Sequence, residues 1–460
     1  MIPLPEKFEE SIRAQLGDEF PAFLSSLQEI PPVSIRLHPG KKPQSPRQHS
    51  VPWSQYGEYL STRPVFTLDP LFHGGSYYAQ EASSMFLEQA LKQSVDLNKP
   101  LNVLDLCAAP GGKSTHLLSL LHQESLLVAN EAIRSRASIL SENIQKWGYP
   151  NAIVTNNDPG DFQRLTGFFD VMVVDAPCSG EGLFRKDPRA MNEWSPANVQ
   201  LCASRQRRIV GDAWDTLRKN GILIYCTCTY NEWEDEENLR WLNANHRVEF
   251  LNLSTDPSWG IKEVKQNGIY AYRFFPHRTR GEGFFISVMR KTEATAPLLI
   301  KNKTGLARPL RKVTEKLQDW IVCNGPVNFF QFQDLVFYVP DGKAKETEFL
   351  LQHLKIVYAG TNVARVKHEK LIPEHAMALS VNINKTNFPV AAISEGDALK
   401  YLRKDVIRLE GILPGFTLLE YNHLPIGWAN VLSNRVNNMY PSDWRIRMPS
   451  TSSGTGGVGK

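Results

Sequence analysis

The sequence has few cysteines and no long apolar run, and these absences exclude several classes of protein. Six cysteines in 460 residues are too sparse for a disulfide-stabilised secreted domain, so we expect reduced thiols in a cytoplasmic protein. No segment approaches the roughly 20 consecutive apolar residues of a membrane span. The first 20 residues carry acidic and basic side chains instead of the apolar core of a signal peptide.

A strong charge of one sign is also missing. The 52 Lys and Arg residues exceed the 48 Asp and Glu residues only slightly, for a net charge of +4. This balance permits a nucleic-acid partner without indicating one. With 42% hydrophobic and 22% charged residues, the composition is that of a folded globular protein.

The common motifs for phosphate, dinucleotide and zinc binding do not fit either. Gly112-Lys113-Ser114 looks like the end of a phosphate-binding loop, but Cys107 stands where that motif requires its first glycine. No GxGxxG motif follows a predicted strand. Cys226 and Cys228 are separated by one residue, whereas structural zinc sites use cysteine pairs two to four residues apart, so we expect no metal site.

Between about residues 71 and 290, short apolar strands alternate with helical segments, which is typical of an α/β fold with a parallel sheet. The predicted strands are Asn102–Leu106, Leu126–Asn130, Ala152–Thr155, Val171–Asp175 and Ile222–Cys226. The predicted helices are Lys113–His122, Arg134–Trp147 and Ser195–Lys219. Hairpins are expected at Tyr270–Phe275 with Gly283–Met289, and within Phe416–Leu432.

A glycine-rich turn follows the first of these strands. It consists of Cys107, Ala108, Ala109, Pro110, Gly111, Gly112 and Lys113. Glycines let the backbone approach a ligand closely, and the helix that follows offers free N–H groups at its start. A bare strand-to-helix turn explains so many small residues poorly, so the pattern favours ligand binding.

Acidic residues follow the next strands and narrow the choice of possible ligands. Glu131 lies where a doubly wound fold places a carboxylate on a ribose diol, and Asp158 follows the third strand. Arg136 lies about one helical turn beyond Glu131. Each acidic residue alone is more often a solvated charge or a helix cap. Together, without a phosphate loop, they indicate S-adenosylmethionine.

Two thiols are expected near this turn. Cys178 follows the strand that ends at Asp175, and Cys228 follows the strand that ends near Cys226. Because the carboxyl ends of parallel strands meet at one edge of the sheet, both thiols should lie in the crevice near Asp175. Cysteine is more often a small buried apolar residue, and we expect that structural role for Cys202, Cys226 and Cys323.

The motifs LDLCAAPGGKS (104–114), VVDAPCSGEG (173–182) and YCTCTYNEWEDEEN (225–238) resemble those of the RNA (cytosine-5) methyltransferases of the Sun/nucleolar-protein family. Residues 398–441 are similar to the PUA-like part of its bacterial RsmF-like branch, which acts on 16S ribosomal RNA. The resemblance implies a Rossmann-like core that depends on S-adenosylmethionine. It implies that Cys107 to Lys113, Glu131, Arg136, Asp158 and Asp175 hold this cofactor.

The pattern along the chain, together with the resemblance, predicts a domain order. We expect an N-terminal RNA-binding-type α+β unit (1–70), the S-adenosylmethionine-dependent catalytic domain (71–292) and a linker (293–308). An intermediate small domain (309–382), a PUA-like RNA-binding domain (383–448) and a disordered tail (449–460) follow.

In the implied reaction, Cys228 is the nucleophile that adds to C6 of cytosine, and Cys178 helps to release the product. Asp175 is placed to bond N3 and the exocyclic amine of the base. Negative charge would oppose a thiolate, so we expect the acidic side chains of residues 232–237 to point away from the thiols.

The expected substrate is single-stranded or looped RNA, because the target base must leave its stack. Candidate RNA contacts are Arg273, His277, Arg278 and Arg280. Ribosomal RNA is favoured, free or within a ribosomal subunit, with no membrane and no DNA partner. Transfer RNA as substrate, methylation of an amine, and a non-catalytic role in ribosome assembly remain as alternatives.

Overall fold

The structure is a computed structural model and describes residues 4–41, 49–296, 308–368 and 370–448. A long mixed sheet forms its centre, in the order β10-β11-β12-β8-β7-β4-β5-β6-β15, with β9 paired to β12. Its strands are β4 (Asn102–Asp105), β5 (Leu126–Asn130), β6 (Ala152–Thr155), β7 (Phe169–Asp175), β8 (Leu217–Thr227), β9 (Val248–Phe250), β10 (Lys262–Gln266), β11 (Ile269–Phe274), β12 (Phe284–Lys291) and β15 (Ile356–Ala359).

The strands predicted as parallel are parallel. β4 pairs with both β5 and β7, β5 pairs with β6, and β7 pairs with β8, all in the same direction. The predicted hairpin is confirmed as the antiparallel pair β11 and β12. The carboxyl ends of β4, β5, β6, β7 and β8 therefore lie along one edge, where a doubly wound sheet binds its ligands.

Helices cover both faces of this sheet. Leu117 of α5 and Leu140 of α6 pack in one apolar cluster, and Ile209 of α8 and Leu239 of α9 pack in another on the opposite face. Each helix buries its apolar side against the alternate residues of the strands. The helices of this part are α4 (Leu87–Ser94), α5 (Gly112–Leu120), α6 (Arg134–Trp147), α7 (Pro188–Glu193), α8 (Pro196–Ala213) and α9 (Glu236–Asn245).

One predicted boundary is wrong. The helix expected over Ser195–Lys219 ends at Ala213, a 3₁₀ turn follows, and β8 already begins at Leu217. Phe169 of β7 pairs with Leu217, so contact with the neighbouring strand extends β8 into a polar stretch that has no strand signal of its own.

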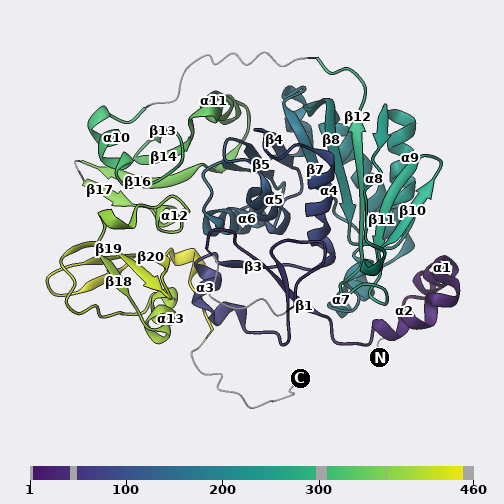
Figure 1. Cartoon of the computed structure of the whole chain (residues 1–460), viewed down its shortest axis with the longest axis horizontal. Coiled ribbons are helices and arrows are strands. Elements are labelled where there is room, and N and C mark those ends of the chain that lie inside the picture. Colours follow the sequence, from purple (N-terminus) through teal and green to yellow (C-terminus); the bar gives the residue numbers. More distant parts are fainter. Residues whose placement is uncertain (1–3, 42–48, 297–307, 369, 449–460) are drawn as a thin grey trace.

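The N-terminal unit packs against the part of the sheet that carries the predicted thiols. Phe8 of α1 and Phe23 of α2 join Phe184, Tyr230 and Phe275 in one buried cluster. Figure 1 shows α1 and α2 at the edge of the molecule that carries α9 and β10. The elements of this unit are α1 (Glu6–Leu16), α2 (Phe20–Ser26), β1 (Val33–Leu37), β2 (Gly57–Leu60), α3 (Pro70–His73) and β3 (Tyr77–Ala79).

Two small sheets, β13-β14-β16-β17 and β18-β19-β20-β21, occupy the opposite side of the molecule (Figure 1). β15 leaves the first of these regions and pairs with β6, so the intermediate region extends the central sheet. The elements are α10 (Arg311–Gln318), β13 (Val327–Phe332), β14 (Leu335–Pro340), α11 (Ala344–His353), β16 (Thr361–Lys367), β17 (Lys370–Pro373), α12 (His375–Ala378), β18 (Val390–Ala392), α13 (Glu395–Arg403), β19 (Gly415–Tyr421), β20 (Leu424–Val431) and β21 (Val436–Asn438).

The second predicted hairpin is formed by β19 and β20. The expected tail, residues 449–460, lies outside the described residues, as do residues 297–307 of the expected linker. Within the described ranges, no helix is both long enough and apolar enough to cross a membrane.

Candidate active site

The glycine-rich turn connects β4 to α5 in a shape that needs its small residues. Gly111 has a φ of 115°, a backbone conformation that side chains disfavour, and a Cβ there would lie 3.3 Å from Leu140. A Cβ on Gly112 would lie 3.3 Å from Tyr78. The turn is therefore packed closely against α6 on one side and β3 on the other.

α6 holds the turn through its side chains. Arg136 donates to the Ala109 carbonyl at 2.9 Å, and Asn143 donates to the Pro110 carbonyl at 2.8 Å. Arg136 also lies 3.3 Å from a carboxylate oxygen of Glu131. The structure thus brings Glu131 and Arg136 to the turn, as the sequence predicts.

Asp105, at the end of β4, is a candidate that the sequence analysis missed. Its side chain is fully buried, and one carboxylate oxygen accepts a hydrogen bond from the Ser114 hydroxyl at 2.6 Å. The other oxygen has no hydrogen-bond partner among the described residues. Burial raises the pKa of Asp105 to about 7, against the hydrogen bond from Ser114 and with a further contribution from the negative charge of Asp175. The sequence did contain a signal for this residue, because Asp105 is a carboxylate at the end of an apolar strand.

Lys113 and Asp175, both predicted cofactor residues, contact each other. The Lys113 ammonium lies 2.7 Å from an Asp175 carboxylate oxygen and 5.1 Å from the centre of the Phe284 ring. Burial alone would lower the pKa of Lys113, but the charge and hydrogen bond of Asp175, together with the charges of Cys226 and Asp105, outweigh burial and raise the pKa. Lys113 therefore stays charged and fixes the Asp175 side chain at the end of β7.

Asp158 differs from the other predicted cofactor residues. Its side chain is 54% exposed, lies 3.2 Å from Arg208, and caps the 3₁₀ turn that begins at Pro159. Its role in holding the cofactor stays a prediction.

The charges at this edge fit S-adenosylmethionine, which carries a sulfonium and an ammonium group. Asp105, Glu131 and Asp175 supply carboxylates, and the unpartnered buried oxygen of Asp105 is an acceptor suited to an ammonium donor. Cys107 lies close to these same groups, and burial followed by the charge of Asp105 raises the pKa of its thiol. We expect Cys107 to remain a neutral thiol.

The two predicted thiols lie side by side. The Cys178 and Cys228 sulfurs are 2.7 Å apart, and the Cys228 backbone N–H points at the Cys178 sulfur at 3.3 Å. Both residues are partly exposed. The turn after β7 and the segment after β8 converge here, because Gly182 donates its N–H to the Cys228 carbonyl at 2.8 Å.

The two thiols have different electrostatic surroundings. The hydrogen bond with Cys228, then burial and the charges of Cys228 and Glu234, raise the pKa of Cys178 well above its usual value. Cys178 therefore stays protonated, and its S–H group can donate a hydrogen bond to the Cys228 sulfur.

Cys226 takes no part in this pair. It is fully buried, and its sulfur lies 3.8 Å from an Asp175 oxygen. Burial raises the pKa of Cys226 well above its usual value, against the opposing charge of Lys113. Its surroundings match the structural role predicted for it.

The expectation that the acidic residues 232–237 point away is wrong for Glu234. This side chain is buried and accepts hydrogen bonds from the Ser179 N–H at 3.0 Å and from Gln206 at 2.8 Å. Glu181 accepts from the Thr229 hydroxyl at 2.7 Å and from the Tyr230 N–H at 2.9 Å. These carboxylates connect the segment that follows Cys178, the segment that follows Cys228 and helix α8 through hydrogen bonds.

The predicted RNA contact at Arg273 needs correction. Its side chain is 2% exposed, lies 2.9 Å from Asp235 and also pairs with Glu236. The carboxylates neutralise it inside the protein, so Arg273 offers no charge to an RNA phosphate. Its place is structural, beside the segment that follows Cys228, because it donates to the Tyr230 carbonyl at 2.9 Å.

The other three candidates lie nearer the surface. His277 and Arg278 both bind Glu19, at 2.9 and 2.6 Å, which lowers the pKa of that carboxyl to about 2. Arg280 is exposed, stacks 4.2 Å above the Tyr59 ring, and has no carboxylate partner in the described ranges. A cavity of about 470 Å³ is lined by Trp53, Tyr59, Trp259, Arg278 and Arg280, among others.

Arg36 of β1 was not predicted and supports the turn from behind. It is fully buried and donates to the Gly112 carbonyl at 3.3 Å and to the Thr115 hydroxyl at 2.6 Å. Burial lowers its pKa to about 9. Arg36→Met should lower the free energy of unfolding by about 2 kcal/mol and weaken cofactor binding, because these carbonyl and hydroxyl groups lose their donor. Thermal unfolding and calorimetric titration check this, and an unchanged melting temperature would contradict it.

No cluster of three or more His, Cys, Asp or Glu side chains with the geometry of a metal site occurs in the described part of the chain.

Three family models match consecutive parts of the chain. The N-terminal domain of 16S rRNA methyltransferase RsmF matches residues 4–82, 16S rRNA methyltransferase RsmB/F matches 93–290, and the RsmF PUA domain matches 388–446.

Curated relatives match over most of their length. The ribosomal RNA small subunit methyltransferase F of Shigella boydii serotype 4 (strain Sb227) is 33% identical over 414 residues, which cover 85% of this chain and 84% of the relative. The protein of the same name from Escherichia coli O157:H7 (strain EC4115 / EHEC) is 31% identical over 416 residues, with the same coverage of each chain.

Solved structures share the fold. A methyltransferase homolog protein from Pyrococcus horikoshii is 25% identical with a TM-score of 0.52, covering 62% of this chain and 95% of that one. NSun6 from Pyrococcus horikoshii, solved with SFG, is 19% identical with a TM-score of 0.50, covering 63% of this chain and 98% of that one.

Proposed function

The chain belongs to the RsmF family of 16S ribosomal RNA methyltransferases, and from this premise we propose that it methylates C5 of a cytidine in RNA, with 16S ribosomal RNA as the favoured substrate. Methyltransferases of this family depend on S-adenosylmethionine, which supplies the methyl group. The observation that carries the proposal is the pair of sulfurs, 2.7 Å apart, beside Asp175 at the edge of the sheet. A methyltransferase that acts on an amine needs no such pair.

The first step is attack by Cys228. C5 of cytosine is a poor nucleophile, and a thiolate that adds to C6 gives C5 the electron density to accept a methyl group. Cys178, held neutral, stabilises the Cys228 thiolate by donating a hydrogen bond. Asp175, fixed by Lys113, can accept a hydrogen bond from the exocyclic amine of the base. The acceptor carboxylates of Asp105 and Glu131 would hold the cofactor on the turn.

The second step is release. Once Cys228 is bonded to C6, its negative charge and its hydrogen bond with Cys178 are gone, and these are two of the causes that raise the pKa of Cys178. Cys178 then gives up its proton more readily, and the partly exposed site lets water take it. The Cys178 thiolate can remove the proton from C5, after which the C6–sulfur bond breaks and frees the product.

The RNA must present a single unstacked base to the two thiols. Arg280, with its uncompensated charge, and the aromatic side chains of its cavity suit a phosphate and a stacked base. The chain runs from Arg280 directly to Gly283, whose carbonyl a Cβ on Gly182 would approach to 2.6 Å. The cavity around Arg280 is therefore connected by a short segment to the turn that carries Cys178.

Bisulfite sequencing of RNA from cells that lack the protein tests the proposal. We expect one cytidine of 16S ribosomal RNA to lose its C5 methylation, and the wild-type gene to restore it. The Cys228→Ala variant should restore none of it, because the sulfur that adds to C6 is gone while Cys178 remains in its neutral form. Restoration by Cys228→Ala, or loss of methylation only in transfer RNA, would contradict the proposal.

A further inference from the structure

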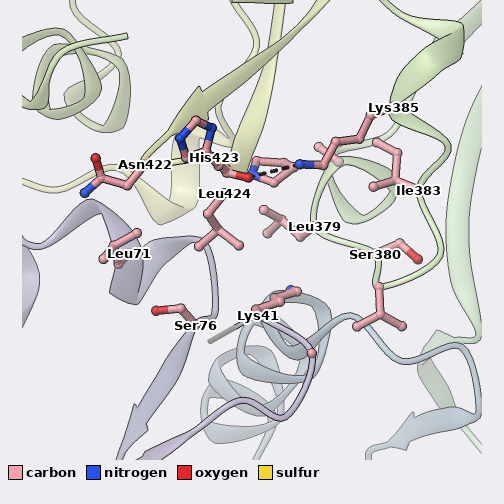
Figure 2. A pocket seen from close by; sticks show the side chains of 14 residues that line it. Lys41, Leu71, Ser76, Leu379, Ser380, Ile383, Lys385, Asn422, His423 and Leu424 are labelled. Carbon is pink, nitrogen blue, oxygen red and sulfur yellow. Dashed lines mark hydrogen bonds between the residues drawn. The ribbon is translucent and has the colours of Figure 1, made fainter. Parts of the chain in front are cut away.

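A cavity of about 760 Å³ lies where three regions of the chain meet, and its lining includes neither the two thiols nor the glycine-rich turn. One wall comes from the N-terminal unit, one from the segment after α12, and one from the turn between β19 and β20 (Figure 2). Interiors are normally packed without spaces of this size, and the volume is in the range of ligand pockets.

The walls are joined to one another by specific bonds. Val381 donates its N–H to the Gly148 carbonyl at 3.1 Å, and Lys385 donates to the His423 carbonyl at 3.0 Å, as Figure 2 shows for the second. The Trp428 indole donates to the Glu374 carbonyl at 2.9 Å. These bonds hold the segments around the cavity in fixed positions.

Lys41 places an amine in the wall with no carboxylate partner among the described residues. Its ammonium donates to the Lys146 carbonyl at 2.7 Å and to the Gly74 carbonyl at 3.3 Å, and no ion pair with a described residue is present. Burial lowers the pKa of Lys41 to about 7. An anion in the cavity would supply the missing countercharge. Lys385 on the facing wall differs, because Glu420 neutralises it at 2.6 Å.

A second polar group in the wall has no partner. The Ser76 side chain is 1% exposed, and its hydroxyl has no hydrogen-bond partner among the described residues. Hydroxyl groups buried in this way are normally bonded. Together with Lys41, it offers a donor and a charge on the same side of the cavity, the pair of groups that a phosphate accepts.

The remaining wall suits a flat apolar group. Leu71, Leu379, Ile383 and Leu424 line the cavity, and Figure 2 shows Leu379 and Leu424 near its centre. Asn422, in the turn between β19 and β20, adds an amide that can bond the edge of a base. A phosphate joined through a sugar to an aromatic base is a nucleotide.

The cavity is remote from the thiols. Lys41 contacts the carboxyl-terminal end of α6 at Lys146, whereas Arg136 near its amino-terminal end contacts the cofactor turn. The 14 residues of α6 span about 20 Å. A nucleotide in the cavity is therefore not the cytidine that reacts.

We propose that this cavity binds a second nucleotide of the substrate RNA, with its phosphate at Lys41 and Ser76 and its base against the leucines. The proposal rests on the proposed function, which makes RNA the ligand of this protein. The cavity then sets the distance between an anchored nucleotide and the methylated cytidine.

Binding of a short fluorescein-labelled oligocytidylate, followed by anisotropy at several salt concentrations, tests the proposal. Lys41→Gln should weaken binding about tenfold and reduce the slope of log affinity against log salt by about 0.7, the contribution of one phosphate on a single strand. Lys312→Gln removes the same charge from the exposed face of α10 and should change neither value. Equal binding by both variants would overturn the proposal.

Ser76→Ala separates binding from folding. Because the Ser76 hydroxyl has no partner among the described residues, its removal should leave thermal unfolding unchanged while weakening oligocytidylate binding about fivefold. Unchanged binding in this variant would overturn the role of Ser76.

Two further comparisons identify the source of the nucleotide. If cytidine monophosphate binds in a Lys41-dependent way but oligocytidylate binding does not depend on Lys41, the cavity takes a free nucleotide and the proposal is overturned. Lys41-dependent RNA binding without any 5-methylcytidine formation would overturn the proposed function and support the cavity. Formation of 5-methylcytidine together with RNA binding that does not depend on Lys41 would support the proposed function and overturn the proposal for the cavity.

Discussion

Replacing Cys178 by alanine is expected to stop turnover while RNA accumulates on the protein as a covalent adduct. Cys228 can still attack C6 and the methyl group can still be transferred, but the thiol that lies 2.7 Å away and removes the C5 proton is gone. Loss of a general base lowers the rate by about 100- to 10,000-fold. Denaturing gel electrophoresis with ordinary cytidine-containing RNA and S-adenosylmethionine should reveal the adduct.

Cys226→Ser is the matched control, because it changes a neighbouring thiol that is fully buried and not part of the pair. This variant should turn over and leave no stable adduct. Normal turnover by Cys178→Ala, or an adduct in the control only, would remove Cys178 from the release step.

Replacing Asp105 by asparagine is expected to weaken S-adenosylmethionine binding by about 30- to 100-fold, the value of a hydrogen bond between charged groups. The unpartnered Asp105 oxygen is the acceptor that we assign to the ammonium group of the cofactor. Isothermal titration measures the effect. Asp158→Asn, which changes an exposed carboxylate paired with Arg208, should have a smaller effect.

The same residue predicts a pH dependence of the free protein. A pKa raised to about 7 means that folded Asp105 holds a proton between about pH 4 and 7 that the unfolded chain releases. Stability from this group is therefore present at low pH and is lost as the pH rises through 7, with an upper limit of about 4 kcal/mol. Without cofactor, denaturant unfolding should find Asp105→Asn more stable than the wild type at pH 8. The difference in the free energy of unfolding should be smaller at pH 5. An identical pH dependence in both proteins would contradict this.

Local patterns in the sequence predicted the catalytic core well. α6 was expected and found at Arg134–Trp147, because its apolar spacing is helical and Gly148 ends it with a left-handed residue. The comparisons confirm the predicted fold class, a Rossmann-like methyltransferase core between an N-terminal domain and a C-terminal PUA domain. The domain boundaries and site residues stay predictions.

What the sequence could not predict depends on distant pairings. Arg273 looks like a surface cation until its partners Asp235 and Glu236, on a different element, are known. β15 joins the central sheet only through its contact with β6, about 200 residues earlier in the chain. Glu234 was expected to avoid the thiols because of its charge, but hydrogen bonds from Ser179 and Gln206 hold it beside them.

The central claim is that Cys228 is the sulfur that attacks the base. RNA carrying 5-fluorocytidine at the methylated position tests it most directly, because fluorine at C5 cannot be removed as a proton is and the adduct is trapped. Tandem mass spectrometry of the digested complex should find the nucleotide on the Cys228 side chain itself and not on Cys226 of the same peptide, and Cys228→Ala should form no adduct. A nucleotide attached to Cys178 or Cys226, or an adduct that persists in Cys228→Ala, would contradict the account.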